Sequence, residues 1–137
     1  MKYLTTIGRI LFALPFGILG LNHFLMQSYY TGMISTFIPG GGYTIIITGL
    51  ALIAACISII AKKYIQISCL LLALLLFIFI LTIHIPGLFD SNPVKILNMD
   101  TKVSTLALIE LFKDISLMGG ALMIAGIYRE EKVVEKA

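Results

Sequence analysis

Charged residues are scarce in this chain of 137 residues. Ten are basic and seven are acidic, together 12% of the sequence, whereas 59% of the residues are hydrophobic and the mean hydropathy is +1.03. A chain of this length that folds in water exposes a large surface, and so few charges would leave most of it apolar. The composition therefore excludes an ordinary soluble domain and predicts the lipid bilayer as the solvent.

Residue patterns of familiar catalytic and binding sites are also missing. The chain has no phosphate-binding loop and no nucleophile beside a base. Its two cysteines, Cys56 and Cys69, are not in a C-x-x-C pattern, and we interpret them as small apolar core residues in the cytoplasmic half. The basic residues are dispersed, so no nucleic-acid partner is predicted. A self-sufficient enzyme has no candidate site in this sequence.

Long hydrophobic runs are what the chain does contain. Four of them, each of about 20 mostly apolar residues, cover residues 4–26, 43–61, 64–85 and 103–128. An α-helix of that length crosses a hydrocarbon core of about 30 Å, and the alternation typical of transmembrane strands is absent. The first run begins like a signal peptide but lacks an A-x-A-like cleavage site, so we expect a retained helix. The sequence predicts an all-α membrane protein, a single domain over residues 1–137 that forms an antiparallel four-transmembrane-helix bundle.

The basic residues in the short flanks predict the orientation of this bundle. One side carries most of them: Lys2, Lys62, Lys63, Arg129, Lys132 and Lys136. The other side has Lys95 and Lys102, offset by Asp90 and Asp100. By the positive-inside rule, both termini are cytoplasmic and the chain is a multi-pass protein of the inner (cytoplasmic) membrane.

The two outer connections differ in character. Residues 27–42 carry no charge and two tyrosines, which suits either a short interfacial helix or an ordinary loop. Residues 86–100 lie between prolines and turn-forming residues, so a surface loop is predicted there.

Six ionisable side chains inside the predicted spans form the candidate site: Arg9, His23, His84, Glu110, Lys113 and Asp114. Helical spacing places those of each helix on one face. A lone charge at the centre of a membrane helix costs about 2.5 to 3.5 kcal/mol, so the charges should pair in the interior. We predict a cluster open to the outer face, with both histidines near outer helix ends and Lys113 and Asp114 near mid-membrane. Arg9 is predicted to pair with Asp114 or Glu110.

A purely structural interpretation of these side chains stays open. Buried ion pairs sometimes only fix helix register, and interfacial histidines can serve as amphipathic anchors. Small residues between them are predicted to allow close helix packing: Gly17, Gly20, Gly49, Gly119 and Gly120. No metal site is predicted, although two histidines on different helices at matching depth could ligate a haem or a metal ion.

Four stretches of this sequence resemble the DoxX family of small four-helix membrane proteins. They are "GRILFALPFGILGLNHF", "YTIIITGLALIAA", "LTIHIPGLF" and "LFKDISLMGGALMIAG", and the resemblance extends from about Gly8 to Gly126. Arg9 matches the arginine that opens the family's first helix, and His23 matches a basic or polar residue at its end. Lys113 and Asp114, with Gly119 and Gly120, match the "KD…GG" pattern of the fourth helix.

One departure from the family pattern is visible. Many members carry an acidic residue about four positions before the glycine that Gly49 matches, where this chain has Ile45. If that carboxylate takes part in family chemistry, this protein lacks it or uses Glu110 instead.

The resemblance implies a role beside quinone chemistry. The family takes its name from a subunit of a terminal quinol oxidase, and relatives are linked to thiosulfate:quinone oxidoreduction or to oxidative-stress complexes. The expected function is an accessory or quinone- or lipid-binding subunit of a redox-linked membrane system. Its expected partners are the bilayer, other membrane redox subunits or further copies of the chain. The alternative is a non-redox carrier of a small molecule or a scaffold subunit, because fold kinship does not transfer function.

Overall fold

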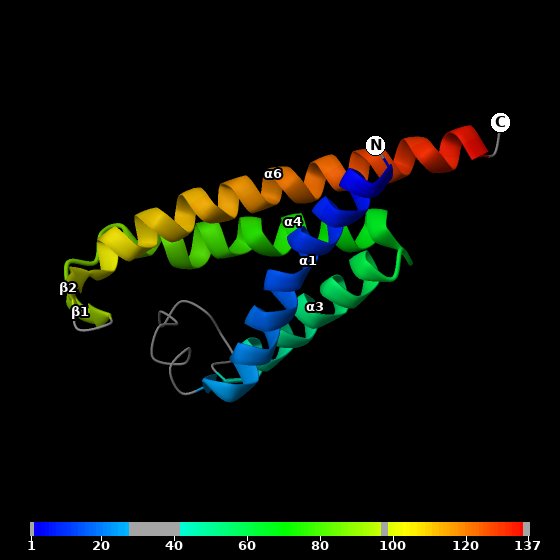
Figure 1. The fold of residues 1–137 in the computed structure, drawn as a ribbon. Coiled ribbons are helices and arrows are strands. Elements are labelled where there is room, and N and C mark those ends of the chain that lie inside the picture. Colours follow the sequence, from blue (N-terminus) through cyan, green and yellow to red (C-terminus); the bar gives the residue numbers. More distant parts are fainter. Residues whose placement is uncertain (1, 28–41, 97–98, 136–137) are drawn as a thin grey trace.

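Four long helices make up most of the computed structural model, which describes residues 2–27, 42–96 and 99–135 (Figure 1). They are α1 (Lys2–Leu25), α3 (Gly42–Ile60), α4 (Ile65–Phe79) and α6 (Val103–Glu135). Helix α4 continues through the π-helical segment η1 (Ile80–His84) into the single turn α5 (Ile85–Gly87). The four predicted helices are therefore present, and α6 extends seven residues further than predicted, to Glu135 instead of residue 128.

Three helices are long and apolar enough to cross a membrane: Tyr3–Leu25, Gly42–Ile60 and Ile65–Gly87. Large apolar side chains along them face outward, and Leu4, Ile47 and Leu71 are each more than half exposed. Apolar surface on this scale is unfavourable in water and favourable in lipid. The protein is therefore an integral membrane protein that crosses the bilayer more than once. Helix α6 is not among these three, so the fourth crossing stays a prediction.

The helices associate in two neighbouring pairs. Helix α1 packs on α3, and α4 packs on α6, which runs in the opposite direction beside it (Figure 1). A tight turn joins α3 to α4, with Lys62 and Tyr64 in the left-handed backbone region (φ 58° for both). Away from that turn, the α1–α3 pair diverges from the α4–α6 pair (Figure 1). The most completely buried side chains join α1, α3 and α4: Phe16, Ile59, Leu72 and Cys69.

Small residues allow the closest helix contacts, as predicted for four of five glycines. A Cβ atom on Gly20 would lie 2.7 Å from the carbonyl oxygen of Gly49, so α1 and α3 cross with their backbones in contact. Gly17 lies against Cys56, and Gly120 of α6 lies against the Phe12 ring of α1. Gly119 differs, because a Cβ atom there would meet no atom of the described residues within 4 Å. Its packing role stays a prediction.

The outer connections can be compared with the predictions only in part. The alternatives for residues 27–42, an interfacial helix or a loop, concern residues 28–41, which lie outside the described residues. The predicted surface loop over residues 86–100 is partly wrong. Strands β1 (Pro93–Ile96) and β2 (Met99–Lys102) form an antiparallel hairpin in which Pro93 is opposite Lys102. Four-residue strands are too short to give a recognisable alternation in sequence.

Candidate functional site

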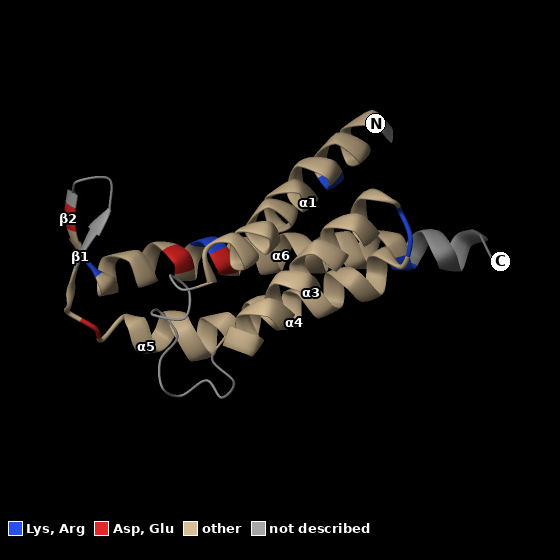
Figure 2. Cartoon of the chain, turned by 90° about the horizontal axis from the view of Figure 1, so that it is seen from below, with Lys and Arg blue, Asp and Glu red and all other residues tan. Residues whose placement is uncertain are grey.

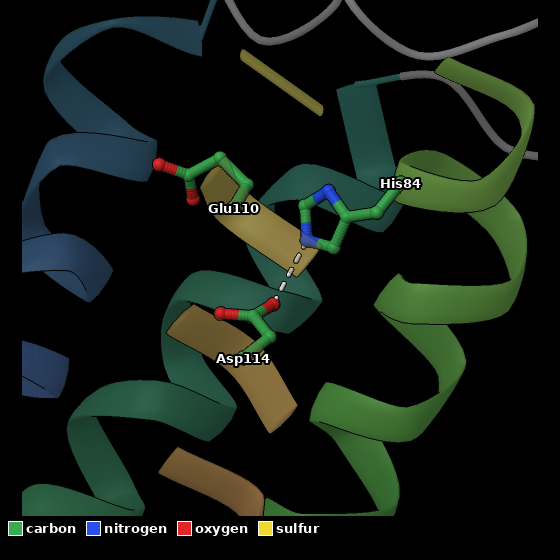
Figure 3. A group of neighbouring side chains, drawn as sticks. All are labelled: His84, Glu110 and Asp114. Atoms are coloured by element: carbon green, nitrogen blue, oxygen red, sulfur yellow. Dashed lines mark hydrogen bonds and ion pairs between the residues drawn. The ribbon is translucent and has the colours of Figure 1, made fainter. Parts of the chain in front are cut away.

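A buried histidine and a buried carboxylate meet between α4 and α6. The Nε2–H of His84 donates a hydrogen bond to Oδ2 of Asp114 at 2.9 Å (Figure 3). Only 8% of His84 and 4% of Asp114 are exposed, so the two groups satisfy each other inside the protein. No hydrogen bond joins the other ring nitrogen, Nδ1, to any group in the described part of the chain. The pair therefore has one internal hydrogen bond and one ring nitrogen left for another partner.

Two more charged side chains extend the pair toward the surface. Glu110 lies one helical turn before Asp114 on the same face of α6 (Figure 3). Lys113 donates a hydrogen bond to Oε2 of Glu110, and its Nζ lies 3.7 Å from Oδ1 of Asp114. The side chains of Glu110 and Lys113 are almost half exposed. We call these four residues, His84, Glu110, Lys113 and Asp114, the outer cluster, after the side of the membrane on which the sequence predicts them.

The π-helical segment η1 places His84 at this position. The backbone N–H of Ile85 donates to the carbonyl of Ile80, five residues earlier, which widens the last turns of α4. Pro86 follows directly, and proline can neither donate a backbone hydrogen bond nor fit a regular α-helical turn without a clash. Wide turns of this type often occur at functional sites. Here the widened turn is directly followed by a residue that disfavours a regular α-helix, and it turns His84 toward α6.

The outer cluster lies near one end of the membrane-crossing part of the protein. His84 is three residues from the end of the span Ile65–Gly87, at the end opposite the Lys62–Lys63 turn (Figure 2). Because Asp114 touches His84, it lies at the same level. The predicted depths of His84, near an outer helix end, and of Asp114, near mid-membrane, therefore cannot both hold, and the position of His84 in its span favours the end. The long α6 helix begins beyond the end of α4, which brings its twelfth residue, Asp114, level with that end.

Arg9 does not join the outer cluster. Its Nη1 donates hydrogen bonds to the carbonyl oxygens of Ile59 and Ile60, the second at 2.9 Å. These carbonyls are at the C-terminal end of α3, where a helix has no backbone donors to satisfy them. In the described part of the chain, no ion pair joins Arg9 to Asp114 or Glu110. The predicted ion pair of Arg9 with Asp114 or Glu110 is wrong, because Arg9 instead binds helix-end carbonyl oxygens that have no backbone donor.

His23 is also separate from the outer cluster. Its Nδ1 donates to the carbonyl oxygen of Leu19 at 2.7 Å, within α1, and its Cβ lies beside Gly49 of α3. The two histidines therefore belong to different helix pairs. No described contact brings the His23 and His84 rings together, so the haem alternative gains no support from their placement.

The outer cluster offers a defined set of chemical groups. Two carboxylates, one ammonium and one imidazole give it a net negative charge when His84 is neutral. A carboxylate held on a histidine orients the ring and keeps the hydrogen on the nitrogen that faces it, so the other ring nitrogen can act as an acceptor. Nitrogen and oxygen ligand atoms of His84, Glu110 and Asp114 also lie within 4.8 Å of one another. The cluster can hydrogen-bond a polar headgroup, exchange protons or hold a cation.

Sequence reasoning missed two features of this site. The spacing of polar residues predicted that His84 shares a face with the apolar residues of its helix, but it could not name Asp114 as its partner. The signal for the π-helical segment was "HIPG", a histidine and a proline close to the helix end. We interpreted that stretch only as the end of a span.

Comparisons of this chain with protein-family models, curated proteins and solved structures found no match.

Proposed function

We propose that this membrane protein is an accessory subunit of a redox-linked membrane system and that its outer cluster binds the headgroup of a quinone. The observation that carries the proposal is the buried His84–Asp114 pair, whose Nδ1 has no described hydrogen-bond partner. A quinol hydroxyl can donate to that nitrogen, and Lys113 can donate to the second oxygen of the headgroup. The resemblance to the DoxX family supports the same choice of ligand.

The chemistry of quinol oxidation fits these groups. A quinol loses two electrons and two protons when it becomes a quinone. In the proposal, His84 accepts one proton at a time while Asp114 stabilises the resulting imidazolium, and Glu110 passes each proton to water at the exposed side. The electrons pass to an acceptor in a partner subunit. The residues of this chain bind the headgroup and move its protons.

The position of the outer cluster supports a lipid-soluble ligand. His84 lies within the last turns of the span Ile65–Gly87, and Asp114 is buried against it on α6. The other two residues of the cluster, Glu110 and Lys113, are almost half exposed. A quinone has a similar division, with a polar ring and an apolar tail. The ring can reach Glu110 and Lys113 while the tail stays beside the exposed apolar side chains of the helices.

Quinone binding by the purified protein in lipid nanodiscs tests the proposal. A short-chain quinone is equilibrated with wild-type protein, His84→Gln and the matched control His23→Gln. The proposal expects saturable binding by the wild type and the control, and binding by His84→Gln that is weaker by about tenfold or more, equivalent to 1.4 kcal/mol. Equal binding by all three proteins would contradict the proposal and favour a carrier of another molecule or a scaffold.

A further inference from the structure

We infer that His84, Glu110 and Asp114 form a binding site for a divalent first-row transition metal ion, with zinc as the simplest probe. The inference uses part of the cluster to which quinone binding was assigned above, but it needs no quinone and stands on its own ligand geometry. One nitrogen or oxygen atom from each of the three side chains lies within 4.8 Å of the other two (Figure 3).

The distances need only a small rearrangement to hold a metal ion. Zinc bonds to histidine nitrogen and carboxylate oxygen are about 2.0 to 2.2 Å, so tetrahedral ligand atoms lie about 3.3 Å apart. Nε2 of His84 and Oδ2 of Asp114 are already 2.9 Å apart. An ion between them takes the place of the hydrogen that they share. The Glu110 carboxylate offers an oxygen within 4.8 Å of a ligand atom of each of the other two residues, and its half-exposed side chain can move closer.

The ligand types also select a class of ion. One imidazole nitrogen with two carboxylate oxygens is a donor set for zinc, manganese or ferrous iron, whereas calcium and magnesium prefer oxygen alone. Three protein ligands leave a fourth position for water or another ligand, as in catalytic zinc sites. Two of the three ligands are buried, so the ion would replace an internal hydrogen bond and not merely collect at a surface.

The side chain of Lys113 should affect metal binding and quinone binding in opposite ways. Its ammonium contacts Glu110 and lies 3.7 Å from Asp114, so it competes with a metal ion for the same carboxylates. Removing this charge should strengthen metal binding several-fold. For a quinone headgroup the same substitution replaces a charged hydrogen-bond donor with a neutral and shorter one, and it should weaken binding. Lys113→Gln should therefore raise the affinity for a metal ion and lower the affinity for a quinone.

Metal binding is measured on the full chain, purified with a histidine-free tag, treated with a chelator and dialysed against Zn²⁺. The inference expects one ion per chain for the wild type and for the control His23→Gln. Binding by His84→Gln, Asp114→Asn and Glu110→Gln should each be weaker by about tenfold or more. Binding by Lys113→Gln should be tighter. A Co²⁺-loaded sample should show the visible absorption of a four-coordinate nitrogen–oxygen site, which disappears in His84→Gln.

Several outcomes would overturn the inference. The inference is wrong if the wild-type protein binds Zn²⁺ no more tightly than a double variant that carries His84→Gln and Asp114→Asn. It is also wrong if His84→Gln or Glu110→Gln binds Zn²⁺ as tightly as the wild type, or if Lys113→Gln binds it more weakly. Glu110 is partly exposed and its replacement should leave the fold intact, which far-ultraviolet circular dichroism checks. Quinone binding by the chelated protein, assayed in parallel, separates failure of the metal site from failure of the proposed function.

Discussion

The hydrogen bond between His84 and Asp114 is the central interaction of the candidate site. Asp114 is buried beside membrane-crossing helices, and an unpaired carboxylate there would be costly. His84 removes that cost by donating a hydrogen bond, and both groups become part of one unit. This arrangement explains how the mostly apolar part of α6, residues 103–128, tolerates the sequence "ELFKD".

A double-mutant cycle tests the pair. We expect His84→Ala and Asp114→Ala to be destabilising individually, and the double variant to lose less than the sum, with a coupling of about 1 to 2 kcal/mol. The free energy of unfolding is measured in mixed micelles with increasing denaturing detergent. Losses that simply add would mean that the two side chains do not support each other.

Substitutions of Arg9 and Asp114 should have independent effects on stability, in contrast to those of His84 and Asp114. Arg9→Met removes hydrogen bonds to the carbonyls of Ile59 and Ile60, and it should cost about 2 kcal/mol of unfolding free energy. Because Arg9 and Asp114 are not hydrogen-bonded, Arg9→Met and Asp114→Asn should add to within about 0.5 kcal/mol. The same detergent unfolding assay applies. A coupling energy well above that value would instead support the ion pair between Arg9 and Asp114 that the sequence predicted.

At this scale the sequence predicted the residues better than their contacts. Polarity alone identified six ionisable side chains in apolar surroundings, and four of them do meet in the outer cluster. Their pairing could not be predicted, because helical spacing gives direction on one helix and says nothing of how neighbouring helices are shifted. Arg9 shows the consequence, since its acceptors are backbone carbonyls that have no sequence signature.

Among the elements, the crossing of α1 and α3 depends most directly on two glycines. Gly20→Ala places a methyl group 2.7 Å from the backbone oxygen of Gly49 and from Ile53, so the helices must separate. We expect a loss of about 1 to 3 kcal/mol in the free energy of unfolding. Gly119→Ala, the matched control on α6, has open space and should be neutral or stabilising by up to about 1 kcal/mol. Equal effects of the two substitutions would argue against this crossing.

The ends of elements were the least predictable. Long apolar runs predicted the helix ends within two residues, except that α6 continues seven residues further, because a membrane span needs about 20 apolar residues whatever its neighbours are. The π-helical segment η1 has five residues, and each strand of the β1–β2 hairpin has four. Elements this short carry too few residues for a periodic pattern, and tertiary contacts decide them.

For the whole molecule, the orientation and the fourth crossing are open to direct test. In a protein with Cys56 and Cys69 replaced by alanine, a single cysteine is placed at Lys63 or at Asp100, both of which are exposed. An impermeant thiol reagent should label Asp100→Cys in intact cells and Lys63→Cys only in inverted vesicles, because basic flanks stay cytoplasmic. A reporter fused after residue 137 should be active in the cytoplasm if α6 crosses.

Labelling of both cysteines from the same side would contradict the topology. A cytoplasmic reporter together with cytoplasmic Asp100→Cys would show that α6 stays on one side of the membrane. In that case the outer cluster would face the cytoplasm.

The two helix pairs suggest a division of labour across the molecule. Helices α1 and α3 are held by close backbone packing, and the four side chains of the outer cluster come from η1 and α6. A photoreactive quinone analogue in nanodiscs tests this division, and with it the central claim, most directly. We predict that cross-linked peptides map to residues 80–87 and 106–118, and that excess unmodified quinone or His84→Gln removes them. Cross-links mainly on α1 and α3, or labelling unaffected by His84→Gln, would contradict the account.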